Sequence, residues 1–120
     1  MLVVDAANVI GSRPTGWWRD RAGAARRFVG QVQSSVREGR LKAPMILVLE
    51  GRAREGADEG DDDGVEVVHA SGEGDDTIVS IAEAGDGVVV VTADRALAER
   101  VRAVEAEVVG PRWLLDQLGD

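Results

Sequence analysis

Short apolar runs that alternate with segments of helical periodicity constrain the fold of this chain more than any other feature. Strands are expected at residues 2–5, 45–49, 65–69, 88–91 and 107–109. Helices are expected at residues 20–38, 75–84 and 94–104, and a last one follows Pro111. Because strands that alternate with helices form parallel sheets with right-handed crossovers, the pattern predicts an α/β fold with a central parallel sheet of about five strands.

Acidic residues stand where these strands end or where the following helix begins. They are Asp5, Glu50, Glu73, Asp75, Asp76 and Asp94. In an open parallel sheet the ligand lies outside the carboxyl ends of the strands, at the point where the strand order reverses. If the strands follow the order third, second, first, fourth, fifth, this point falls between the first and fourth strands. Those two strands would then bring Asp5 and Asp94 side by side.

Carboxylates gathered at one edge repel one another unless a positive charge joins them, and hard divalent cations prefer oxygen ligands. The sequence therefore predicts a Mg²⁺- or Mn²⁺-dependent nuclease that hydrolyses phosphodiester bonds. Asp5, Asp75 and Asp94 are the expected catalytic metal ligands. Glu73 and Asp76 would assist if a second ion binds. The number of ions is left open.

Each of these side chains also has a purely structural interpretation. Asp5 and Asn8 form a D-x-x-N pattern in which Asn8 either holds the Asp5 carboxylate, binds a phosphate, or belongs to an Asx turn. Asp75 and Asp94 stand where they would cap helices. Glu50 is either an outer metal ligand or an ion-pair partner of a nearby arginine.

The composition narrows the class of protein. The length of 120 residues suits one domain, there is no cysteine, and one histidine leaves no zinc cluster. The chain has no apolar run long enough for a membrane helix and no signal-peptide pattern, so no membrane association and a cytoplasmic location are expected. Although the net charge is −8, residues 1–44 hold 8 basic and 3 acidic groups. A basic flank beside an acidic centre suits a nuclease, although a solvated arginine-rich helix gives the same pattern.

The substrate-binding candidates lie mostly in this basic flank. They are Arg13, Arg19, Arg26, Arg37 and Arg95, together with Trp17 and Trp18. Aromatic side chains among arginines can stack bases and hold phosphates. At least one indole is expected to pack structurally, and a contact through the tryptophans leaves a homodimer open. His69 is expected to be a half-buried strand residue, and the aspartates of residues 61–63 a solvated loop tip.

Three segments resemble one nuclease group in the order in which that group carries them. LVVDAANVIG at residues 2–11 resembles the opening of NYN domains, within the PIN-like nucleases, including the YacP-like branch. EGDDTIVSIA at residues 73–82 resembles their acidic helix start, and VVVVTADRAL at residues 88–97 resembles a later strand-to-helix step.

The resemblance implies a single PIN-like (NYN) domain over residues 1–120. It also implies a three-layer α/β/α sandwich, a Mg²⁺ or Mn²⁺ site, and cleavage of RNA in preference to DNA. It places Asp5, Asn8, Asp75 and Asp94 at the group's functional positions. Ala96 departs from the pattern, because some relatives have a further acidic residue there.

Three other classes of protein are less compatible with these residues. A noncatalytic RNA-binding or scaffold domain with the same fold remains the main alternative. A phosphoacceptor receiver domain needs a lysine near its last strand, and the only lysine, Lys42, precedes the second strand. A haloacid-dehalogenase-type phosphatase would have a second aspartate where Ala7 stands.

Overall fold

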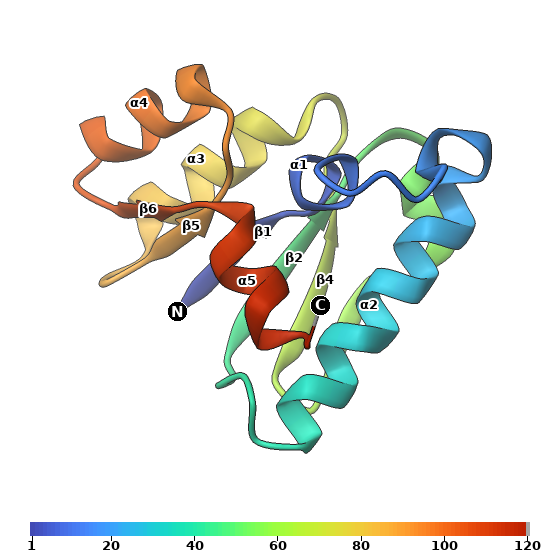
Figure 1. Ribbon diagram of the computed structural model, residues 1–120. Coiled ribbons are helices and arrows are strands. Elements are labelled where there is room, and N and C mark those ends of the chain that lie inside the picture. Colours follow the sequence, from blue (N-terminus) through green and yellow to red (C-terminus); the bar gives the residue numbers. More distant parts are fainter. Residues whose placement is uncertain (120) are drawn as a thin grey trace.

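The computed structural model describes residues 1–119 and has one mixed sheet at its centre, shown in Figure 1. The strands are β1 (Leu2–Asp5), β2 (Met45–Leu49), β3 (Gly60–Asp62), β4 (Val65–His69), β5 (Val89–Val91) and β6 (Glu107–Val109). Their order across the sheet is β3-β4-β2-β1-β5-β6. The five strands expected from the sequence are parallel and in the expected order, and the sheet differs from the prediction by the added edge strand β3.

Helices cover both faces of this sheet. The helices are α1 (Ala6–Gly11), α2 (Arg21–Arg37), α3 (Gly74–Ala84), α4 (Arg95–Ala103) and α5 (Pro111–Gln117). In Figure 1, α3 and α4 lie together on one side of the sheet, and α2 and α5 lie on the other. The fold is therefore the expected α/β/α sandwich.

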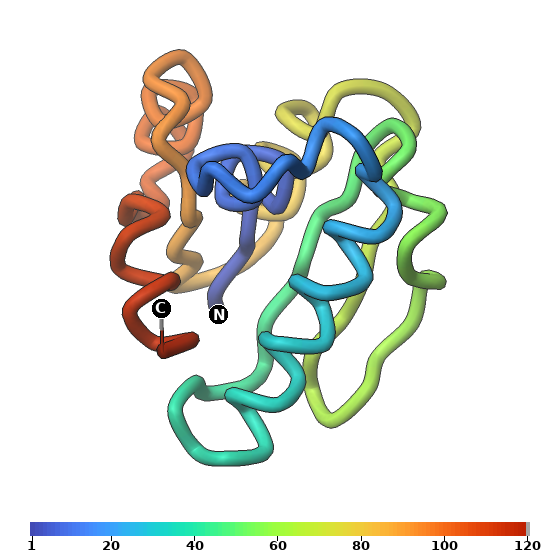
Figure 2. Tube along the Cα trace, turned by 45° about the vertical axis from the view of Figure 1, so that its right-hand side comes forward, coloured from blue at the N-terminus to red at the C-terminus, as the bar shows by residue number. Residues whose placement is uncertain are grey.

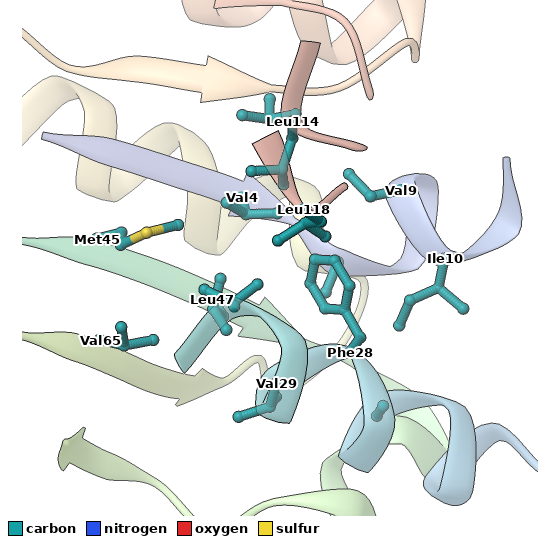
Figure 3. Packing of buried hydrophobic residues seen from close by; sticks show 14 of the residues in the cluster. Val4, Val9, Ile10, Phe28, Val29, Met45, Leu47, Val65, Leu114 and Leu118 are labelled. Atoms are coloured by element: carbon teal, nitrogen blue, oxygen red, sulfur yellow. The ribbon is translucent and has the colours of Figure 1, made fainter. Parts of the chain in front are cut away.

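The two faces of the central strands fill two separate apolar cores. Val4 and Leu47 point towards α2 and α5, whereas Val3 and Val48 point towards α3 and α4. Figure 3 shows Phe28 of α2 between the side chains of Val4, Leu47 and Leu118. Strand β2 is buried at every position because helices cover it on both sides, which explains its uninterrupted apolar sequence.

Two segments differ from the sequence-based expectation. The expected loop at residues 51–64 contains a 3-10 helix, η2 (Gly51–Gly56), and the edge strand β3, which pairs antiparallel with β4. All residues of β3 are exposed, so its backbone pairing has no apolar pattern in the sequence. The short helix α1 was not expected either, since it directly continues β1 and Asp5 serves as its cap.

The two ends of the sheet carry different segments of the chain, as the Cα trace in Figure 2 shows. The short helix α1 and the first turn of α2 lie at the end where β1 finishes, and the N-terminus lies at the other end. Within residues 1–119, no helix is both long enough and apolar enough to cross a bilayer.

The segment η2 is held against α2 by a close backbone approach at Gly56. A Cβ atom at this position would collide with the carbonyl oxygen of Ala22 and approach the Cβ of Ala25 to 2.9 Å. We expect Gly56→Ala to lower the free energy of unfolding by about 1–3 kcal/mol in urea titrations. Gly30→Ala is the matched control, because a Cβ atom there meets nothing within 4 Å in the middle of α2. That variant should be about 0.4–1 kcal/mol more stable, and equal effects of the two changes would contradict this packing.

Candidate functional site at the carboxyl edge of the sheet

Asp5 is the most buried acidic side chain of the site, with 7% of its surface exposed. Its Oδ2 accepts a hydrogen bond from the hydroxyl of Thr92 at 2.9 Å, and its Oδ1 lies 3.4 Å from the backbone N–H of Asn8. The pKa of Asp5 is raised to about 6, mainly by burial. The hydrogen bond from Thr92 stabilises the carboxylate and lowers the pKa, whereas the negative charges of Glu50 and Asp75 contribute to raising it. A carboxylate kept in such a position costs stability when it is ionised.

The raised pKa of Asp5 predicts how the stability of the metal-free protein depends on pH. The folded state binds the proton more tightly than the unfolded chain, so Asp5 favours folding below about pH 4 and loses this contribution as the pH rises through about 6. The shift corresponds to about 3 kcal/mol at most. In EDTA we expect this contribution to make the free energy of unfolding fall between about pH 4 and 6 and to level off above that range. An increase over this range in urea titrations would contradict the prediction.

A hydrogen-bonded network joins Asp5 to Asp94 across the neighbouring strands β1 and β5. The hydroxyl of Thr92 donates to Asp5 and accepts from the backbone N–H of Asp94 at 3.1 Å. Oδ1 of Asn8 accepts from the backbone N–H of Ala93 at 2.7 Å, which ties α1 to the turn before α4. The network thus fixes both aspartates at the point where the strand order reverses.

Asp94 also caps the N-terminus of α4, the structural role that its place in the sequence allowed. Its Oδ1 accepts from the backbone N–H of Leu97 at 3.1 Å, at the start of α4. Capping uses a carboxylate oxygen without neutralising the negative charge. Asp94 therefore raises the pKa of Asp75, which lies across the edge at the start of α3.

Asp75 is half-buried among like charges. Partial burial raises its pKa first, followed by the charges of Asp94, Glu50 and Glu73, while Arg100 opposes them. Glu50 is anchored here, because its Oε2 accepts from the backbone N–H of Gly74 at 2.8 Å. The expected alternative, an ion pair of Glu50 with an arginine, does not describe this contact. The guanidinium of Arg54 instead donates to the carbonyls of Gly51 and Ala70.

Asp76 differs from the other acids of the group. It is exposed and forms an ion pair with Arg100 at 2.8 Å. This contact directs its carboxylate to α4. The sequence grouped Asp76 with the metal ligands because the two aspartates are adjacent, but successive residues of a helix point in directions about 100° apart.

The donor chemistry at this edge suits a hard divalent cation, because Asp5, Glu50, Asp75 and Asp94 supply carboxylate oxygens, and the surrounding negative charges help to raise the pKa of Asp5 and of Asp75. Their arrangement does not by itself complete a coordination shell. Within residues 1–119, no three acidic or histidine side chains are placed so that they could jointly hold an ion.

A cleft of about 470 Å³ opens beside the acids, between α1, α2 and η2. Its walls include Trp17, Arg21 and Ala53, and its rim includes Glu50 and Glu73. The guanidinium carbon of Arg21 lies 5.4 Å from the centre of the Trp17 ring. Arg21 was not among the expected substrate residues, because Trp17 and Arg21 belong to different helices, η1 (Trp17–Arg19) and α2, and no helical spacing indicates their contact.

The other expected substrate residues fall into two groups. Arg95 lines a second cleft with Thr92 and Ala93, beside the site. The guanidinium carbon of Arg19 lies 5.8 Å from the ring centre of Trp18, and Trp18 is 54% exposed. The guanidinium of Arg13 donates a hydrogen bond to the side chain of Gln31 in α2. Trp17 is only partly exposed and packs on the core, as expected for at least one indole.

Arg37 was expected to bind substrate, but its position on α2 contradicts this prediction. Arg26 lies between Arg21 and Arg37 on the same helix. The guanidinium of Arg37 binds Asp62 and Asp63 at 3.2 and 3.0 Å. Arg37 also lies about 24 Å along α2 from Arg21, given the rise of about 1.5 Å per residue. It is therefore at the opposite end of the sheet from the acids. Arg26 is exposed and its backbone lies beside Gly56 of η2.

His69 has the structural role that the sequence indicated. Its Nε2 lies 2.7 Å from the carbonyl oxygen of Ala57, and its backbone N–H donates to Glu59. The two contacts hold the segment after η2 against β4. The aspartates at residues 61–63 are exposed, as expected, although they belong to the hairpin of β3 and β4 and not to a loop tip.

Taken with the acidic edge, this sheet order defines an α/β/α protein with a candidate site at the reversal point between β1 and β5. The chain matches no protein-family model and no curated protein. Its structure is similar to the crystal structure of Rae1 (YacP) from Bacillus subtilis, with a TM-score of 0.68 and 21% sequence identity. The match covers 98% of this chain and 73% of that chain, and it shows a YacP-like fold.

Proposed function

We propose that this protein is a divalent-metal-dependent nuclease that hydrolyses RNA. The observation that carries the proposal is the electrostatic coupling of Asp5, Asp75 and Asp94 at one edge of the sheet. Burial of ionisable groups without cationic partners destabilises a fold, and perturbed carboxylates of this kind concentrate at functional sites. The YacP-like fold and the order of the three sequence motifs support the same conclusion.

In this proposal each side chain has a distinct role. Asp5, Asp75 and Asp94 would hold Mg²⁺ or Mn²⁺, and Glu73 is close enough in sequence and charge to assist. When bound, the cation would lower the pKa of water and offset negative charge on the phosphate. Glu50 holds the first residue of α3 in place, and Asn8 holds the turn before α4. Arg21 and Arg95 flank the edge and would bind substrate phosphates.

The engagement of Asp76 by Arg100 favours one cation in this site. Arg100 also lowers the pKa of the neighbouring Asp75, so it supplies positive charge close to the acids. A fixed guanidinium can offset charge where a second ion would otherwise be needed. The absence of a further acid at Ala96 agrees with this arrangement.

The test is an incubation of the protein with a fluorescently labelled single-stranded RNA in EDTA, Mg²⁺ or Mn²⁺. We expect cleavage only with a divalent cation, and slower or no cleavage of a DNA strand of the same sequence. In parallel, Mn²⁺ should raise the melting temperature at pH 8 and have less effect at pH 5, where Asp5 is mostly protonated. RNA binding without any turnover would instead support the noncatalytic RNA-binding alternative.

A further inference from the structure

The cleft beside the acids has a composition that the hydrolytic chemistry does not require. Apolar side chains, including Ala7 and Ala53, form much of its surface. One side carries the ring of Trp17 with the guanidinium of Arg21, and the rim nearest the sheet carries Glu50 and Glu73. An apolar cleft thus leads directly from an aromatic and cationic wall to the acidic edge.

The aromatic wall of this cleft is held firmly in place. The ring of Trp17 meets the ring of Trp18 edge-on, with centroids 5.9 Å apart. A Cβ atom added at Gly11 would lie 3.6 Å from the Trp17 ring, so the indole rests against the end of α1. Arg21 extends from the first turn of α2 across the same ring. These contacts preorganise a flat surface, which lowers the entropic cost of stacking a ligand on it.

We propose that this cleft binds one unpaired nucleobase, that of a nucleotide adjacent to the phosphate under attack. The inference rests on the proposed nuclease function and specifies its substrate as single-stranded. A phosphodiester that reaches the acidic edge must place the neighbouring nucleoside somewhere, and this cleft adjoins that edge through Glu50 and Glu73. A volume of about 470 Å³ lies within the range of small-ligand sites and accommodates a base and its ribose.

The charges around the cleft agree with a nucleotide in preference to a neutral apolar ligand. Arg21 offers a guanidinium at the aromatic wall, where it can contact a base face or the next phosphate. The carboxylates of Glu50 and Glu73 lie at the rim and can accept hydrogen bonds from ribose hydroxyls or exocyclic amines. A base in a duplex is already stacked and paired, so only an unpaired base can enter.

The first experiment tests the subsite without altering the protein. A labelled octa-adenylate RNA is compared with eight versions that each carry one abasic residue, and both binding in Ca²⁺ and cleavage in Mn²⁺ are measured. Loss of a stacked base is worth roughly 5- to 150-fold in affinity. We expect one abasic position, at fixed distance from the cut, to weaken binding by this factor, and a fully paired octamer to bind as weakly. Uniform effects at all eight positions would overturn the subsite.

The second experiment fills the cleft. Ala53→Leu places three further carbon atoms in the wall, and we expect it to weaken binding of the intact octamer about 5- to 150-fold while leaving binding of the abasic octamer unchanged. Ala103→Leu, at an exposed position on α4, is the matched control and should bind both equally well. Ala7→Leu fills the cleft from α1 and provides a second variant if Ala53→Leu melts early.

The outcomes separate this inference from the nuclease proposal. If both cleft-filling variants bind and cut the intact octamer like the unchanged protein, the subsite is wrong while hydrolysis stands. If filling the cleft weakens binding but no RNA is cut in Mn²⁺ by any form, the base subsite stands and the hydrolytic function is wrong.

Discussion

Asp94→Asn is expected to reduce Mn²⁺-dependent RNA cleavage at least roughly 100-fold, because removal of a direct metal ligand should cost more than the loss of its supporting contacts. The fold should persist. Asparagine caps a helix about as well as aspartate, and its Oδ1 can still accept from the backbone N–H of Leu97. The measurement is a single-turnover cleavage assay accompanied by a thermal melt. The loss of rate without loss of structure would separate the metal-binding role of Asp94 from its capping role.

The matched control for this change is Asp61→Asn. Asp61 accepts a hydrogen bond from the backbone N–H of Gly64 at 2.9 Å, so it also bonds a residue three positions ahead. It lies on the exposed edge strand β3, near the end of α2 that is remote from the acids. This variant loses the same charge and should cleave RNA at the unchanged rate. Full activity of Asp94→Asn would remove Asp94 from the mechanism.

Asp5→Asn is expected to have opposite effects on activity and stability. Activity should fall at least roughly 100-fold, because the buried carboxylate is the proposed ligand closest to the core. In EDTA at pH 8, however, the variant should be about 1–3 kcal/mol more stable. The cost of ionising a group whose pKa is raised to about 6 disappears, and the poorer fit of an amide to the N–H of Asn8 offsets part of the gain. Urea titrations at pH 8 and pH 4.5 measure this difference.

The pH dependence distinguishes this explanation from a general effect of the substitution. At pH 4.5 the native Asp5 is mostly protonated, so the stability advantage of the variant should shrink or reverse. Asp20→Asn is a suitable control, since Asp20 is an exposed cap that accepts from Gly23 at 2.8 Å. Its replacement should change stability by less than about 0.5 kcal/mol at either pH. A loss of stability in Asp5→Asn at pH 8 would contradict the proposed cost of burying this carboxylate.

Function and stability are in conflict at this edge of the sheet for a physical reason. A site that binds a divalent cation needs several ionised oxygens close together, and in the absence of the ion these oxygens repel one another. The structure limits the repulsion through particular contacts: Thr92 donates to Asp5, and the N–H of Gly74 donates to Glu50. Substitutions that remove the charge of Asp5 or Asp75, whose pKa values are raised, should therefore stabilise the metal-free protein, and mutations that remove the donors should not.

Much of the fold could be predicted because its strongest determinants are local and periodic. Buried parallel strands need uninterrupted apolar residues, and the run Met45–Leu49 is buried at every position. The hairpin strand Gly60–Asp62 escaped prediction because an exposed edge strand is held by backbone pairing, which any sequence can form. The helix α1 escaped because it begins at a residue, Asp5, that also ends a strand.

Of the candidate site, the acids could be predicted from the sequence, whereas the arginines could not. Asp5, Asp75 and Asp94 could be selected from the sequence, because each stands where an apolar strand ends or a helix begins, and a parallel sheet gathers such positions at one edge. Whether a given arginine reaches that edge depends on distances along a helix axis, which residue type does not reveal. Arg37 was therefore misplaced and Arg21 was overlooked.

Residue type alone predicted five parallel strands and the acids at their carboxyl ends, because burial on two faces and charge at a strand terminus leave direct marks on the sequence. The order of those strands entered as an assumption, and the structure confirms it and adds β3 at one edge. Three further features emerge in the folded chain alone: Thr92 links Asp5 to Asp94, Arg100 forms an ion pair with Asp76, and Trp17 and Arg21 line a cleft against η2. These contacts join residues far apart in the chain through single hydrogen bonds, ion pairs and ring contacts, and such pairings have no period that a sequence could display.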